Sequence, residues 1–151
     1  MNNLSMLKIV FIMLSVLMLA SAGNSNADKQ PNIETESFWI VLPPEVARHT
    51  AGYGIIKNTG EASDTLLKIT SNAGAVMLHK TEIQSGKARM THIPNIVIEA
   101  HSELVLKPMS FHLMFSDLSP VIFIDGSKAT LFLEFEQSGI IKINILIRPN
   151  W

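Results

Sequence analysis

The chain has 151 residues, of which 47% are hydrophobic and 17% are charged, and it contains no cysteine. Its 12 Lys and Arg residues against 13 Asp and Glu residues give a formal charge of -1, so it has no excess of positive charge for binding nucleic acid or an anionic membrane. The lack of cysteine excludes disulfides, thiolate zinc sites, cysteine nucleophiles and blue-copper centres with a thiolate ligand.

Residues 1–27 have the outline of a secretory signal peptide. One charged residue, Lys8, precedes an apolar run at 9–20, and small polar residues follow. About a dozen apolar residues fall short of the roughly 20 that a membrane-spanning helix needs. We therefore expect cleavage, export to the periplasm, and a mature domain of residues 28–151 without stable membrane insertion. A lipid-anchored form would need a cysteine at the cleavage site, and none is present.

The mature part of the chain is predicted to be all-β. Residues 28–35 are polar and are expected to form a short arm. Short apolar or alternating runs follow, separated by turn residues, and none is long enough at helical period to predict a helix. Strands are predicted at 36–42, 52–58, 64–71, 76–83, 88–93, 96–100, 102–106, 111–115, 129–137 and 140–147. Strands this short, at this spacing, favour an antiparallel β-sandwich with Greek-key connections.

Histidine and methionine gather in the segment from residue 77 to residue 114. This segment holds Met77, His79, Met90, His92, His101, Met109, His112 and Met114, and only His49 among the five histidines lies outside it. Side chains two apart on a strand share a face, so three predicted strands each present an imidazole and a thioether to the same side. Soft thioether sulfur together with imidazole favours Cu(I), and neither group can form a disulfide.

The same residues also have a purely structural interpretation. A buried methionine usually fills a gap in the core, and a single histidine is usually solvated or hydrogen-bonded. The alternation of His112 and Met114 with Phe111, Leu113 and Phe115 indicates one apolar face and one face with another role. A non-metal interaction domain, in which the His and Met residues are structural, nevertheless stays an alternative.

The spacing of four of these residues is more specific than their clustering. His79 is followed by ten residues and Met90, then by twenty-one residues and His112-Leu113-Met114. This pattern resembles the H-x10-M-x21-H-x-M signature of the periplasmic copper chaperone family PCuA(C). Further residues similar to that family's landmarks, spread over roughly residues 33–147, are Trp39, Pro43-Pro44, Gly52-Tyr53, Asn58-Thr59-Gly60, Leu78, Leu106-Lys107-Pro108 and Phe111.

The resemblance implies a cupredoxin-like β-sandwich that is not an enzyme and binds one Cu(I) near its surface through His79, Met90, His112 and Met114. It also implies delivery of copper to the apo copper domain of the respiratory terminal oxidase, directly or with a second, thiol-bearing copper chaperone. Neutral ligands on an accessible face suit such a transfer, because a partner's ligands can replace them one by one. Buffering or detoxification of periplasmic copper would need the same site and stays an alternative.

The chain departs from the family pattern in three places. Many members have a methionine two residues after the first histidine, where this chain has Thr81. The Gly-Gly often found before the last motif element is replaced by Met109-Ser110, so Met109 is either a spare donor or a packing residue. Many members end in a His- and Met-rich tail, whereas this sequence ends at Trp151, so we expect no second copper site. The roles of Met77, His92 and His101 are left open.

Three other functions fit the sequence less well. An electron-transfer cupredoxin needs a copper-thiolate bond, which this chain cannot form. A copper oxygenase that chelates the metal through its N-terminal histidine is disfavoured, because neither Gly23 nor Asp28, the residues after the two candidate cleavage positions, is histidine. A hydrolase would be expected to show a nucleophile pattern such as G-x-S-x-G, and the chain has none.

Overall fold

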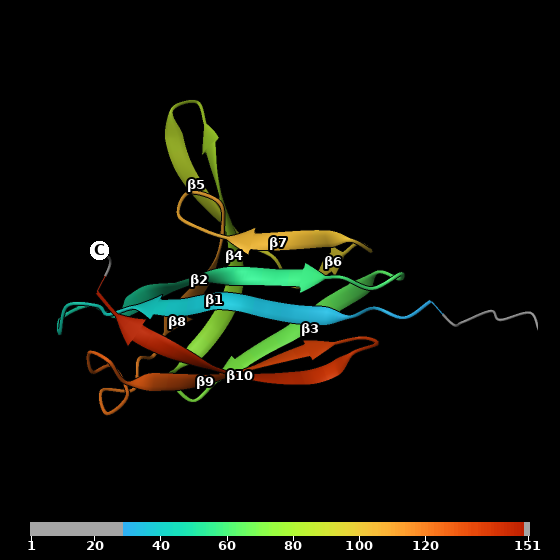
Figure 1. Cartoon of the computed structure of the whole chain (residues 1–151). Helices are drawn as coiled ribbons and strands as arrows, with labels where there is room; N and C mark the ends of the chain where they lie inside the picture. Colours follow the sequence, from blue (N-terminus) through green and yellow to red (C-terminus); the bar gives the residue numbers. More distant parts are fainter. Residues whose placement is uncertain (1–28, 150–151) are drawn as a thin grey trace, which may run out of the picture.

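The computed structural model describes residues 29–149, and this part of the chain is built from strands, turns and loops without a helix (Figure 1). The signal peptide predicted at 1–27 lies outside the described residues. No helix in the described part is long and apolar enough to cross a membrane.

All the predicted strands are present, and their ends differ from the prediction by a few residues at most. In chain order they are β1 (Ile33–Val41), β2 (His49–Asn58), β3 (Asp64–Ser71), β4 (Ala75–Gln84), β5 (Lys87–His92), β6 (Ile96–Ile98), β7 (Ser102–Leu106), β8 (Phe111–Ser116), β9 (Lys128–Phe135) and β10 (Gly139–Arg148). The turn residues between the apolar runs therefore predicted the strand boundaries well.

The prediction of a polar arm at 28–35 is wrong for its last three residues. Residues 33–35 belong to β1 and pair with β2, where Ile33 lies opposite Asn58. Ile33 packs against the core, and the side chain of Asn58 accepts a hydrogen bond from the backbone N–H of Asn32 at 3.2 Å. One apolar side chain and a strand partner distant in sequence thus outweigh the polar composition of this segment.

The ten strands form one hydrogen-bonded sheet in the order β5-β4-β8-β7-β2-β1-β10-β9-β3-β6, and β2 pairs with β8 as well. Most pairings are antiparallel, but β1 with β10 and β7 with β8 run parallel. The sheet curls on itself (Figure 1), so its inner face encloses the core. The predicted all-β sandwich is thereby confirmed, with its two halves joined through hydrogen-bonded strands.

Strands β4 and β8 contribute to the core with one face only. Leu78 of β4 and Leu113 and Phe115 of β8 are almost fully buried. Because successive side chains point to opposite faces of a strand, the residues between them point away from the core. The apolar face predicted for residues 111–115 is therefore real, and the opposite face of these strands is available for another role.

The hairpin of β4 and β5 projects from the body of the sandwich (Figure 1). Every residue of β5 is exposed. The strands are joined by Ser85 and Gly86, both with positive φ (51° and 74°), between the paired residues Gln84 and Lys87. Two residues of positive φ are typical of a type I′ turn, which matches the twist of the flanking strands. The hairpin carries the outer part of the His and Met face into solvent.

The close approach of β2 to the core side of β8 depends on Gly52. A Cβ at this position would lie 2.9 Å from Cε2 of Phe115, which is fully buried. We expect Gly52→Ala to lower the free energy of unfolding by about 1–3 kcal/mol through overpacking, as measured by urea denaturation. Phe115→Leu in the same chain should relieve the clash, so the double variant should lose less stability than the two single losses together. Strictly additive losses would contradict this contact.

Candidate metal centre

The four motif residues lie on one face of three neighbouring strands. On β4, His79 is opposite His112 of β8, and Thr81 is opposite Met90 of β5. Met114 of β8 shares the face of His112, because it lies two residues further along the same strand. The register thus brings together residues that are far apart in the sequence.

The two motif imidazoles lie within the distance over which two rings can bind one ion. The ring centroids of His79 and His112 are 6.0 Å apart, with an interplanar angle of 23°. A ligating imidazole nitrogen lies about 2.0–2.1 Å from a metal such as zinc, so the centroids of two rings on one ion are at most about 6.5 Å apart. Met90, His112 and Met114 also line one open depression of about 360 Å³, together with Thr81, Met109 and Tyr53.

The donors differ sharply in their access to solvent. His112 is only 6% exposed, whereas Met90 on the projecting hairpin is 57% exposed. His79 and Met114 are half-buried. An ion held by this set would therefore have a buried side at β8 and an open side at β5.

The ring of His112 is held in place by a backbone carbonyl. Its Nδ1 lies 3.0 Å from the carbonyl oxygen of Ser110, which also accepts a hydrogen bond from the backbone N–H of Thr81 at 3.0 Å. A carbonyl can only accept, so this contact assigns the proton to Nδ1 and leaves Nε2 as the free electron pair. Such a bond on the other ring nitrogen is the usual way in which proteins orient a metal-binding histidine.

The ring of His79 is not held in this way. Its Nδ1 is buried and has no hydrogen-bond partner within residues 29–149. Burial lowers the pKa of His79 below its ordinary value of 6.5, and the neighbouring rings of His112 and His92 lower it further. The backbone of Met77 opposes this shift in part but completes no hydrogen bond with Nδ1. A buried nitrogen without a partner is costly in an apo protein, and a bound metal would remove that cost.

The donor set suits a soft metal better than a hard one. Within residues 29–149, no group of three or more His, Asp and Glu side chains could hold a metal ion. The other donor that the register brings to this face is thioether sulfur, which favours Cu(I) over ions that prefer oxygen. Among the residues described, imidazole and thioether donors are the groups that the register brings together here.

Three further His and Met residues lie in different surroundings. Met109 lies in the loop before β8 and lines the depression, as does His49 of β2. His101 makes its contacts elsewhere, since its Nε2 lies 3.2 Å from a carboxylate oxygen of Glu61. Sequence reasoning missed His49 and Tyr53 as neighbours of the site, because nothing in the sequence shows that β2 pairs with β8.

Comparisons with known proteins identify the fold. The family model LpqE-like, described as "Putative lipoprotein LpqE-like", matches residues 33–147. No curated protein matches the chain. The copper-bound PCuAC domain from PmoF2 matches with a TM-score of 0.65 at 21% identity, covering 78% of this chain and 92% of that domain. CuI-DR1885 from Deinococcus radiodurans matches with a TM-score of 0.65 at 21% identity, covering 85% and 86%. The predicted cupredoxin-like β-sandwich is thus confirmed.

The lowered pKa of His79 gives a testable pH dependence. The unfolded chain has the ordinary His pKa of 6.5 and the folded chain a lower one, so between these values the unfolded chain binds more protons and stability falls as the pH falls. In NMR titration of the metal-free protein, His79 should have its midpoint below 6.5. Between about pH 7.5 and pH 5.5, His79→Gln should lose less free energy of unfolding than the unaltered protein. A midpoint at or above 6.5 would contradict the burial of this ring.

Proposed function

Since this chain belongs to the LpqE-like family, we propose that it is a periplasmic copper chaperone that binds one Cu(I) through His79, Met90, His112 and Met114. The observation that carries this proposal is the register of β4, which sets His79 beside His112 and Thr81 beside Met90 on the face away from the core. The PmoF2 domain and DR1885, which share the fold, are copper-bound in those structures. The site's two imidazoles and two thioethers form a neutral, soft ligand set of the kind that stabilises Cu(I).

The exposure of the ligands supports transfer rather than storage. Met90 is the most exposed of the four, and it lies on a hairpin that projects from the body of the protein (Figure 1). An acceptor can approach the ion at this open side first, while ligands of the protein still hold it. A thiolate acceptor would then take the ion completely, because thiolate is a stronger ligand for Cu(I) than thioether. In this role the protein carries copper and performs no chemical conversion.

We propose as its partner the apo copper domain of the respiratory terminal oxidase, reached directly or through a second, thiol-bearing copper chaperone. Ligand exchange with such a partner needs close contact at the open side of the site. Periplasmic copper buffering is the second candidate function, because it needs the same accessible Cu(I) ligands.

Replacing sulfur without changing volume tests the site. We expect Met90→Leu and Met114→Leu each to weaken Cu(I) binding by at least tenfold, or about 1.4 kcal/mol, in competition with a chromogenic Cu(I) chelator. The free energy of unfolding without metal should change little, because the substitution conserves volume. Met109→Leu is the matched control, since Met109 lines the same depression outside the proposed ligand set. Unchanged Cu(I) affinity in Met90→Leu and Met114→Leu would show that these two sulfurs serve only in packing.

Delivery and buffering are separated by a transfer experiment. When the Cu(I)-loaded protein is mixed with the apo copper domain of a terminal oxidase, we expect copper to move to that domain, as measured by metal analysis after the two proteins are separated. Failure of this transfer, together with increased copper sensitivity of cells that lack the protein, would favour buffering over delivery.

A further inference from the structure

His79 stands between two sets of possible metal donors. On one side lies His112 of β8, at 6.0 Å between ring centroids, and on the other side lies His92 of β5, at 5.6 Å. Both partners are directly opposite His79 in the strand register. Either distance allows two imidazoles to hold one ion, since the limit is about 6.5 Å. The ring of His79 is therefore as well placed to bind an ion with His92 as with His112.

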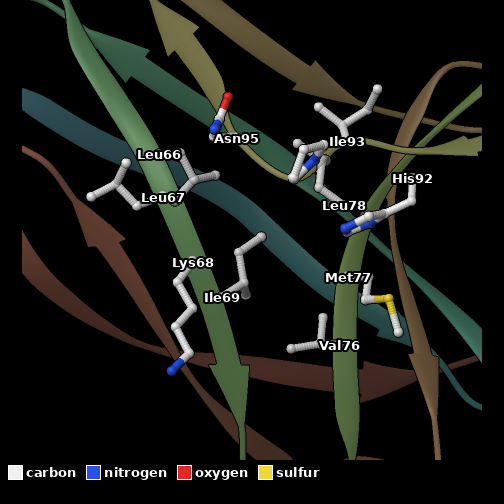
Figure 2. Close-up of a pocket in the computed structure, with 11 residues that line it drawn as sticks. Leu66, Leu67, Lys68, Ile69, Val76, Met77, Leu78, His92, Ile93 and Asn95 are labelled. Atoms are coloured by element: carbon white, nitrogen blue, oxygen red, sulfur yellow. The ribbon is translucent and has the colours of Figure 1, made fainter.

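His92 has a sulfur donor close to it. His92 and Met77 line a depression of about 290 Å³ between β3 and β4, separate from the one lined by Met90, His112 and Met114. Figure 2 shows the ring of His92 and the thioether of Met77 together over β4. The depression is open here because β4 pairs with β5 only from His79 onward. Met77 is 45% exposed, so its sulfur is accessible.

The rings differ in their freedom to move. His112 is fixed by the carbonyl of Ser110. His79 has no hydrogen bond on its buried Nδ1, and the side chain of His92 is exposed, with the ring of His79 beside it at 5.6 Å between centroids. By comparison, His101 is engaged by Glu61. His79 and His92 are thus less firmly held than His112 and can reorient toward a shared ion.

We propose that His79, His92 and Met77 form a second position for the same Cu(I), from which the ion leaves the protein. This inference rests on the proposed function and deepens it. In the exchange, copper keeps its bond to His79, loses those to Met90, His112 and Met114, and gains bonds to His92 and Met77. Copper stays monovalent and no proton moves, because all ligands are neutral. Both positions need His79, so the protein holds one ion at a time.

The test removes the first position and asks what remains. The variant His112→Gln/Met114→Leu should still bind Cu(I), more weakly than the unaltered chain, in competition with a chromogenic chelator. Adding His92→Gln should weaken this residual binding by at least a further tenfold. Adding His101→Gln, the matched control, should leave it unchanged. Residual binding that does not depend on His92, or no residual binding in a folded double variant, would overturn the proposal.

A kinetic measurement keeps the proposal testable if the double variant does not fold. In the otherwise unaltered chain, His92→Gln should slow the transfer of bound Cu(I) to excess chelator, followed by stopped-flow absorbance, whereas His101→Gln should not. An equal rate in both single variants would overturn the second position. If the unaltered chain binds no Cu(I) at all, the proposed function itself is wrong, which is a different result.

Discussion

Strand β4 is hydrogen-bonded to β5 along one edge and to β8 along the other, and this double pairing determines where every donor of the site lies. His79 is opposite both His92 and His112, and Thr81 is opposite Met90. The alternation of side chains in a strand sends Leu78 into the core and His79 to the outer face. A shift of one residue in this register would bury the donors and expose the core, so the packing of the sandwich also specifies the site.

The site combines a fixed, buried side with a free, exposed side. His112 is buried and oriented by the Ser110 carbonyl, which also accepts the Thr81 N–H and so links β8 to β4. Met90 and His92 lie on a hairpin whose outer strand is exposed at every residue. Such asymmetry suits a carrier, because the ion can be held from one side while ligands on the other side are replaced. A fully enclosed site would bind well and release slowly.

Much of this architecture could be predicted from the sequence. Turn residues and alternation located all the strands, and the spacing from His79 to Met114 selected four residues that the structure places on one face. The pairing of β1 with residues near Asn58, and of β2 with β8, could not be predicted, because strand partners distant in sequence leave no local signal. For the same reason the sequence did not show His49 at the site. The position of His92 opposite His79, by contrast, follows from the two-residue turn between Gln84 and Lys87, which is a local signal.

The most direct test of the central claim, that imidazole and thioether ligands from separate strands share one Cu(I), is X-ray absorption spectroscopy of the Cu(I)-loaded full chain. We expect both nitrogen and sulfur neighbours around one copper, with sulfur lost stepwise when Met90 and Met114 are replaced by leucine. A first shell made only of nitrogen and oxygen would contradict it, since the thioethers would then be part of the packing and not of the metal site.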